Sequence, residues 1–264
     1  MSEFSWLRVR TMIRRLSYVF ARTPDRWFLV VVFPFIDVIL FGSIGRYAAE
    51  SGGAGAGAPY LLAGIMLNHF LFQTEVSVAT GFLEETWSRN VLNMMATPLR
   101  EVEYLASLAI WSLLKLAGAI VTVSIAALLL YSFGLAELGP GVVLVGATLI
   151  LCGWAMGLCM VGLLLRFGQS AEIFIWATSF LVLALSGVFN PIHAIPGPLQ
   201  PISRLLPTTY AFEAGRKLLD GQAMPWGDLG WAAGGGLLVL ALAGVFVTRM
   251  LAKFKARGFV TRYS

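Results

Sequence analysis

Charged residues are scarce in this chain. Asp, Glu, Lys and Arg make up 12% of its 264 residues, and hydrophobic residues make up 58%. A water-soluble domain carries about a quarter of its residues as charged side chains. A soluble fold of this size could not bury so much apolar surface, so the composition predicts an integral membrane protein.

Cysteine is also rare. Cys152 and Cys159 are the only two, and on one helix they lie too far apart for a disulfide within the chain. We expect both to be small buried side chains. No group of Cys, His and carboxylate residues has the spacing of metal ligands, and no nucleophile is spaced with a base. The sequence therefore predicts neither a metal site nor a catalytic residue.

Nucleotide-binding motifs are missing from the 264 residues. The P-loop pattern Gly-x-x-x-x-Gly-Lys-[Ser/Thr] does not occur. The Gly-rich run at 51–58 follows no expected strand and does not match Gly-x-Gly-x-x-Gly. We interpret that run as a flexible external loop, and we expect any ATP chemistry to belong to a partner.

Long apolar stretches fill most of the chain. About 20 residues suffice for a helix to cross some 30 Å of hydrocarbon, and helices satisfy their own backbone groups in lipid. The sequence predicts an all-α polytopic membrane protein, with a six-span domain over 27–264 preceded by an amphipathic helix and linker over 1–26. The expected spans lie near 27–46, 59–80, 104–133, 140–166, 172–190 and 229–251.

Basic residues set the expected orientation. Most Lys and Arg residues fall before the first span, in the second and fourth loops and at the C-terminus. The positive-inside rule then places both termini in the cytoplasm. We expect the chain itself to lie in the cell (inner) membrane. The net charge of +5 suits contact with an anionic leaflet, and we expect no nucleic-acid partner.

The first 22 residues have helical periodicity. An apolar stripe runs along one side of this segment, formed by Trp6, Val9, Ile13, Leu16 and Phe20. This pattern predicts an amphipathic helix that lies on the membrane surface. An ordinary solvated leader is the alternative. Thr23-Pro24-Asp25 should break the helix before the first span.

Two connecting segments stand out. Residues 84–96 have an acidic start and an apolar side and end at Thr97-Pro98, which predicts a short cytoplasmic amphipathic helix or a segment that docks into a partner. Residues 186–228 are apolar yet rich in proline. Short helices that dip back into the outer leaflet fit this second segment, and a plain external loop is the alternative.

Four polar residues inside the expected spans are the candidates for a functional role: Asp37, His69, Glu75 and Lys115. Asp37 and Lys115 both lie about 15 Å from the cytoplasmic side at 1.5 Å per residue. An unpaired charge there costs about 3 kcal/mol, so we expect these two residues to pair, either to fix helix packing or to serve substrate passage. Glu75 either lines an inner gate or snorkels to the interface. His69 is expected to be a hydrogen-bonded side chain of the bundle.

Three features together resemble the permease subunit of an ABC type-2 exporter. The first is the Arg-rich leader ahead of six spans. The second is the segment Glu84-Glu85-Thr86-Trp87 … Leu92 … Ala96-Thr97-Pro98-Leu99. The third is the segment Ser186-Gly187 … Pro191 … Pro196-Gly197 … Leu206-Pro207 … Tyr210 … Glu213 … Arg216. The likeness covers nearly the whole chain, and its last segment is the most specific.

The resemblance implies a half-transporter for export. Two copies of the permease, most simply a homodimer, would each dock on a separate ABC ATPase subunit, and ATP and Mg would bind only to that partner. Residues 84–96 would be the coupling helix, with contacts from Glu84, Glu85, Thr86, Trp87, Arg89, Asn90 and Leu92. The proline-rich segment would form outer re-entrant helices, marked by Pro191, Pro196, Pro207, Tyr210, Glu213 and Arg216.

The cargo expected from this resemblance is an amphiphile, such as a glycolipid or polysaccharide, a lipid, or a drug or natural product. Other functional classes stay open at this point. An ion-coupled secondary transporter could use Asp37, Glu75 and Lys115 as a relay. An intramembrane lipid-modifying enzyme would need a polar cluster at one interface, and a non-transporting assembly factor would need none.

Overall fold

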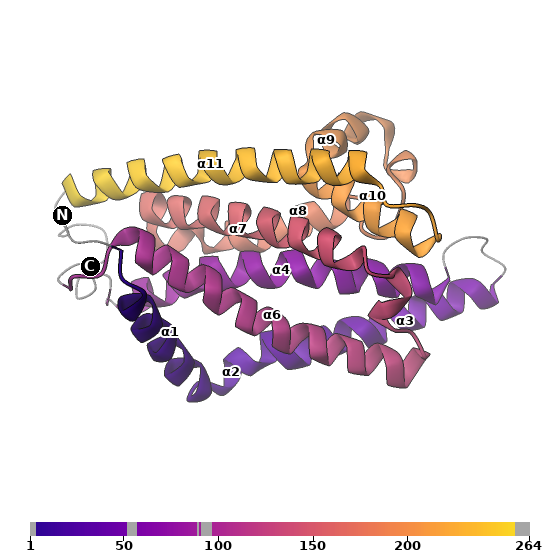
Figure 1. The fold of residues 1–264 in the computed structure, drawn as a ribbon, viewed down its shortest axis with the longest axis horizontal. Helices are drawn as coiled ribbons and strands as arrows, with labels where there is room; N and C mark the ends of the chain where they lie inside the picture. Colours follow the sequence, from indigo (N-terminus) through magenta and orange to yellow (C-terminus); the bar gives the residue numbers. More distant parts are fainter. Residues whose placement is uncertain (1–3, 52–56, 89, 91–96, 257–264) are drawn as a thin grey trace.

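The computed structural model describes residues 4–51, 57–88, 90 and 97–256. Every regular element in these residues is a helix, which confirms the all-α class. The long helices run side by side along one axis of the molecule (Figure 1).

The long helices carry most of the chain. They are α3 (Phe33–Glu50), α4 (Ala58–Trp87), α6 (Glu101–Tyr131), α7 (Val142–Phe167) and α11 (Trp226–Ala256). The shorter ones are α1 (Trp6–Ala21), α2 (Pro24–Trp27), α8 (Glu172–Leu185), α9 (Gln200–Leu205) and α10 (Pro207–Leu219). A π-helical turn, Phe28–Val32, leads into α3, and 3₁₀ turns occupy Leu135–Leu138, Gly168–Ala171, Ile192–Ala194 and Gly197–Leu199.

Five apolar segments among the described residues are long enough to cross a membrane: Phe28–Glu50, Pro59–Trp87, Glu101–Tyr131, Val142–Leu185 and Trp226–Lys253. The expected fourth and fifth spans share one of these segments, which the 3₁₀ turn at Gly168–Ala171 divides into α7 and α8. Gly168 permits that turn through its φ of 71°. At 14 residues α8 is about 21 Å long, so a sixth crossing stays a prediction.

The N-terminal helix forms where its periodicity predicts it. α1 ends at Ala21, and α2 begins at Pro24, as the helix-breaking Thr-Pro pair requires. The buried stripe of α1 is Val9, Met12, Leu16 and Phe20. This stripe packs mainly against α6, so the apolar face of α1 is covered by protein. Trp6 lies off the stripe and is exposed.

Helix α4 is the centre of the bundle. Of its most apolar 18-residue window, 89% is buried inside the molecule, against 17–44% for the other four segments. It contacts α3, α6, α7, α8 and α10. Protein therefore surrounds α4, and the other long helices each keep an outward apolar face suited to lipid.

Helix α7 packs closely against α4, and this contact depends on glycine. A Cβ added at Gly153 would lie 2.6 Å from the Leu71 carbonyl oxygen and would collide with the Thr74 hydroxyl. A Cβ at Gly157 would lie 2.9 Å from the Glu75 carbonyl oxygen. The Gly153-x-x-x-Gly157 pattern thus serves contact within one chain.

The bundle has two distinct ends. At one end, on the left in Figure 1, lie α1, the C-terminal end of α4, the start of α6 and the end of α11. We call this the terminal end. At the other, the proline end, lie α9 and α10.

Candidate functional site

The last turn of α4 carries two acids that a helix would not favour there. The C-terminal end of a helix is the negative end of its dipole, so carboxylates are destabilising at that position. Glu84 and Glu85 lie in this turn. Arginines from the N-terminal region compensate: Arg26 pairs with Glu84 at 3.0 Å, and Arg15 pairs with Glu85.

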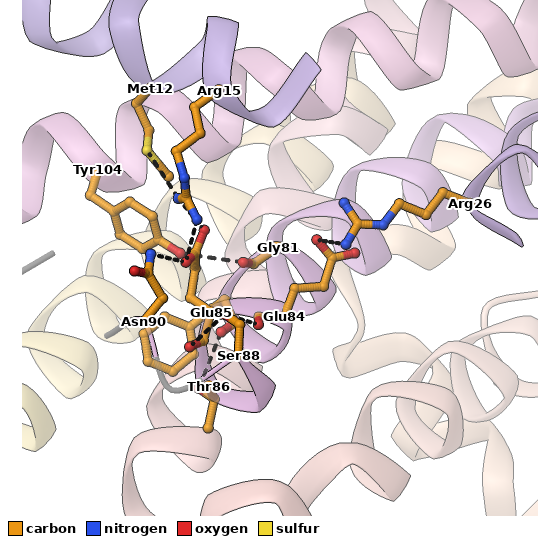
Figure 2. A network of polar contacts seen from close by, with 11 residues as sticks. Met12, Arg15, Arg26, Gly81, Glu84, Glu85, Thr86, Ser88, Asn90 and Tyr104 are labelled. Carbon is orange, nitrogen blue, oxygen red and sulfur yellow. Dashed lines mark hydrogen bonds and ion pairs between the residues drawn. The ribbon is translucent and has the colours of Figure 1, made fainter. Parts of the chain in front are cut away.

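Glu85 is the hub of this network (Figure 2). Its two carboxylate oxygens accept hydrogen bonds from the two terminal nitrogens of Arg15, at 2.5 and 3.0 Å, and Asn90 Nδ2 donates a third at 2.7 Å. The hydrogen bonds to Glu85 raise the pKa of Arg15 above its ordinary value. The Glu85 side chain is 5% exposed and that of Arg15 is 40% exposed. A two-bond fork of this kind fixes orientation as well as charge, so it ties α1 to the end of α4.

A second pairing ties α1 to the start of α6. Arg8 donates hydrogen bonds of 2.7 and 2.6 Å to the buried Glu103 carboxylate. The same carboxylate accepts the backbone N–H groups of Ser5 at 2.8 Å and Arg100 at 2.9 Å. Four donors satisfy this carboxylate, so α1 is joined by fixed geometry to both helices that flank residues 88–100.

This arrangement corrects the expected start of the coupling segment. The prediction that a separate helix begins at Glu84 is wrong, because α4 continues unbroken to Trp87. Hydropathy marks an end at the two acids, but the arginine partners neutralise them and let the helix continue.

The predicted coupling residues divide into bracing and accessible groups. Glu85 and Thr86 are buried, Glu84 is half-buried, and Asn90 holds Glu85. Trp87 is 51% exposed at the tip of α4. Arg89 and Leu92 lie outside the described residues. Trp87 is therefore the member of the set best placed to meet another protein.

Within the span region, the expected pair of Asp37 with Lys115 is wrong for this structure. Asp37 on α3 faces α4, where its Oδ2 lies 3.3 Å from His69 Nε2. Lys115 on α6 faces α1 instead, with its Nζ 5.8 Å from the centre of the Phe20 ring. His69 is fully buried, and neither of its ring nitrogens makes a hydrogen bond within the described residues. The expectation of a hydrogen-bonded histidine is therefore wrong for the described residues, and the Asp37 carboxylate is its charged neighbour.

Glu75 is deeper than its sequence position suggests. Because α4 runs on to Trp87, Glu75 lies about 18 Å from that end at 1.5 Å per residue. It is fully buried, so snorkelling is wrong. Ser179 on α8 donates a hydrogen bond of 2.8 Å to Glu75 Oε2. The other oxygen, Oε1, has no hydrogen-bond partner within the described part of the chain.

The proline-rich segment folds into short helices. Pro207 begins α10, whose buried residues pack against α4, α7 and α11. Arg216 on α10 donates to the carbonyl oxygens of Gly187 and, at 3.3 Å, Asn190, and its burial lowers the pKa of the guanidinium. Tyr210 donates to the Arg204 carbonyl at 2.9 Å. Two helices thus replace the plain-loop alternative, while their position relative to a membrane stays a prediction.

The other outer residues have simpler places. Pro191 and Pro196 each immediately precede a 3₁₀ turn, and Glu213 lies half-buried on α10.

Several partners in these sites escaped sequence reasoning. The arginines of the leader suggested contact with lipid, yet three of them pair with acids far along the chain. Ser179 and Glu103 carried no motif. The signal available was the presence of acids at the ends of otherwise apolar helices, because such acids need partners.

These features define a class first. An all-helical bundle with several helices long and apolar enough to cross a bilayer is a multi-pass membrane protein. The chain belongs to the ABC-2 transporter family: the family described as ABC-2 family transporter protein matches residues 49–249, well over half of the chain. No curated protein matches it closely enough to count as a relative. The match begins at the end of α3, so the arginines of the terminal-end network lie outside it.

Proposed function

We propose that this chain is the permease subunit of an ATP-driven exporter that moves an amphiphile outward across the cytoplasmic membrane. The family match over residues 49–249 carries this proposal, because members of the family are generally membrane subunits of ABC transporters. A separate ABC ATPase binds ATP and Mg, and two copies of each subunit form the working complex. Both termini lie in the cytoplasm, as the arginine-rich terminal end favours.

The ATPase contact in this proposal is the terminal end around Trp87. An exposed tryptophan at a helix tip is a typical anchor of a protein interface, and Trp87 is 51% exposed. Behind it, the pairs Arg15–Glu85 and Arg26–Glu84 hold α4 to α1 and α2. A push on Trp87 would therefore move α4 together with the N-terminal helices.

Helix α4 is suited to carry that movement across the bundle. It is the one described long helix whose surface is mostly covered by protein, and at the proline end it contacts α10. A displacement at one end reaches the other through packed side chains. The exit side of the path would then respond to events on the cytoplasmic side.

Co-purification with the cognate ATPase tests this proposal. Trp87→Ala should weaken capture of the ATPase and lower ATP turnover of the complex, while the permease keeps its thermal stability. Trp226→Ala is the matched control. Trp226 is also exposed (68%), but it is the first residue of α11, and it is the last residues of α11 that lie at the terminal end. Trp226 is therefore far from Trp87. Capture and turnover that are equal for wild type, Trp87→Ala and Trp226→Ala would reject the placement of the contact.

The ion-relay alternative gains no support from the geometry. Asp37, Glu75 and Lys115 each have a different neighbour, His69, Ser179 and Phe20 respectively. No group of three or more metal-ligating side chains occurs in the described ranges. The exporter proposal is therefore the one we carry forward.

A further inference from the structure

Glu75 is an acidic group of the described core with an incomplete set of hydrogen bonds. Its side chain is fully buried in the middle of α4, Ser179 satisfies one carboxylate oxygen, and the other oxygen has no partner in the described residues. Buried polar atoms are nearly always hydrogen-bonded, so an exception calls for an explanation. An ionisable residue inside a membrane bundle is a functional site by default.

The charge balance around Glu75 points to a positive ligand. The Ser179 group that contacts it is a neutral hydroxyl, and no ion pair with Glu75 is found in the described ranges. A buried carboxylate without a cation costs several kcal/mol. Protonation of the carboxyl group would remove this cost, and a cation that replaces the proton would restore the charge balance.

Aromatic rings accompany the carboxyl group. Phe72 lies one helical turn from Glu75 on α4, and Trp176 lies one turn from Ser179 on α8. Their ring centres are 6.3 Å apart. Phe72 also lies within 5.4 Å of the Phe33 ring, measured between centres. Aromatic faces attract organic cations and pack against their apolar parts.

Helix α8 offers a way in from the lipid. Only Ile175 and Val182 of its 14 residues are buried. Phe174, Phe180 and other apolar side chains of α8 are exposed. The hydrogen bond from Ser179 to Glu75 is the polar tie between α8 and α4 that the structure describes. A ligand that competes for the Glu75 carboxyl group would loosen this tie and enter along the α4–α8 seam.

We propose that Glu75 binds a lipophilic organic cation, an ammonium group carried on an apolar or aromatic body, between α4 and α8. The ammonium donates hydrogen bonds to the carboxylate, whose proton leaves to solvent, and the apolar body lies against Phe72 and Trp176. This inference rests on the proposed export of amphiphiles and names the chemical class of the cargo.

Two fluorescent probes of equal shape test the proposal on the full-length permease in lipid nanodiscs. Both carry a dansyl group on an eight-carbon chain, one ending in a primary ammonium and the other in a hydroxyl. Energy transfer from tryptophan reports binding. We expect the ammonium probe to bind at least about tenfold more tightly than the hydroxyl probe, because hydrogen bonds between charged groups are stronger than those between neutral groups.

Variants locate the site. Glu75→Gln keeps the shape and the bond from Ser179, and it should remove the preference for the ammonium probe. Ser179→Ala keeps the carboxylate and frees its second oxygen, so it should bind the ammonium probe at least as tightly as wild type. Asp37→Asn, the matched change at another acid in the span region, should leave the preference intact.

Two results would overturn the inference: equal binding of both probes by the wild type, or an unchanged preference in Glu75→Gln. The binding assay needs no ATPase, so it is separate from the test of the proposed function. Binding at Glu75 without ATP-driven export would reject the exporter and keep the site. ATP-driven export without a Glu75-dependent preference would do the reverse.

Discussion

Replacing Gly153 by alanine should separate α7 from α4. A Cβ at this position would lie 2.6 Å from the Leu71 carbonyl oxygen and against the Thr74 hydroxyl. Neither group can retreat easily, because one is helix backbone and the other hydrogen-bonds to the Phe70 and Leu71 carbonyls. Overpacking of this kind costs about 1–3 kcal/mol, and it falls on the central helix of the bundle.

The same substitution also changes helix propensity, which must be measured separately. Alanine is better than glycine in a helix by up to about 1 kcal/mol. Gly230 on α11 has nothing within 4 Å of an added Cβ, so Gly230→Ala records the propensity effect alone. The difference between the two variants should be the overpacking cost of about 1–3 kcal/mol.

Unfolding by SDS titration in mixed micelles, followed by tryptophan fluorescence, gives both free energies. We expect Gly153→Ala to be the less stable of the two and Gly230→Ala to be equal to or slightly more stable than wild type. Equal stability of the two variants would refute the close approach of α7 to α4 at Gly153.

Three further changes probe the other contacts. Arg15→Ala should destabilise the protein by about 1–3 kcal/mol in the same titration, because it leaves the buried Glu85 carboxylate without its cation. Asp37→Asn and Lys115→Met should have additive effects, within about 0.5 kcal/mol, in a double-mutant cycle, because the two residues share no contact. Arg216→Ala should speed proteolytic cleavage before α10, because it releases two carbonyl groups there.

Neighbouring arginines supply the controls. Arg14→Ala removes an exposed side chain whose guanidinium bonds to the exposed Tyr18 hydroxyl of the same helix, so its effect should stay within about 0.5 kcal/mol. Arg204→Ala removes an exposed side chain and should leave proteolysis unchanged. Equal effects of Arg15→Ala and Arg14→Ala would count against the α1–α4 bracing. Non-additive effects of Asp37→Asn and Lys115→Met would indicate that the two residues interact after all, against their separate contacts in the structure.

The apolar spans could be predicted from the sequence because their signal is local. A run of Leu, Val and Phe longer than a bilayer is thick has few other solutions, and four of the six expected spans correspond to one helix each. Positions that depend on distant partners could not be predicted this way. The acids at 84 and 85 indicate a helix end until Arg15 and Arg26 are known to neutralise them.

The same limit applies to the polar residues in the spans. Depth along the chain placed Asp37 and Lys115 at similar levels, but it says nothing about the direction in which each side chain points. Their pairing failed because α3 turns Asp37 toward His69 and α6 turns Lys115 toward Phe20. Which helix faces which is a property of the assembled bundle.

Encirclement of α4 by its neighbours has a consequence for how this protein tolerates change. Substitutions on an outward apolar face meet lipid, which accommodates many shapes, whereas almost every position of α4 meets a fixed neighbour. A saturation library should therefore show its longest intolerant stretch at 61–86, and homologous chains should diverge fastest on α11.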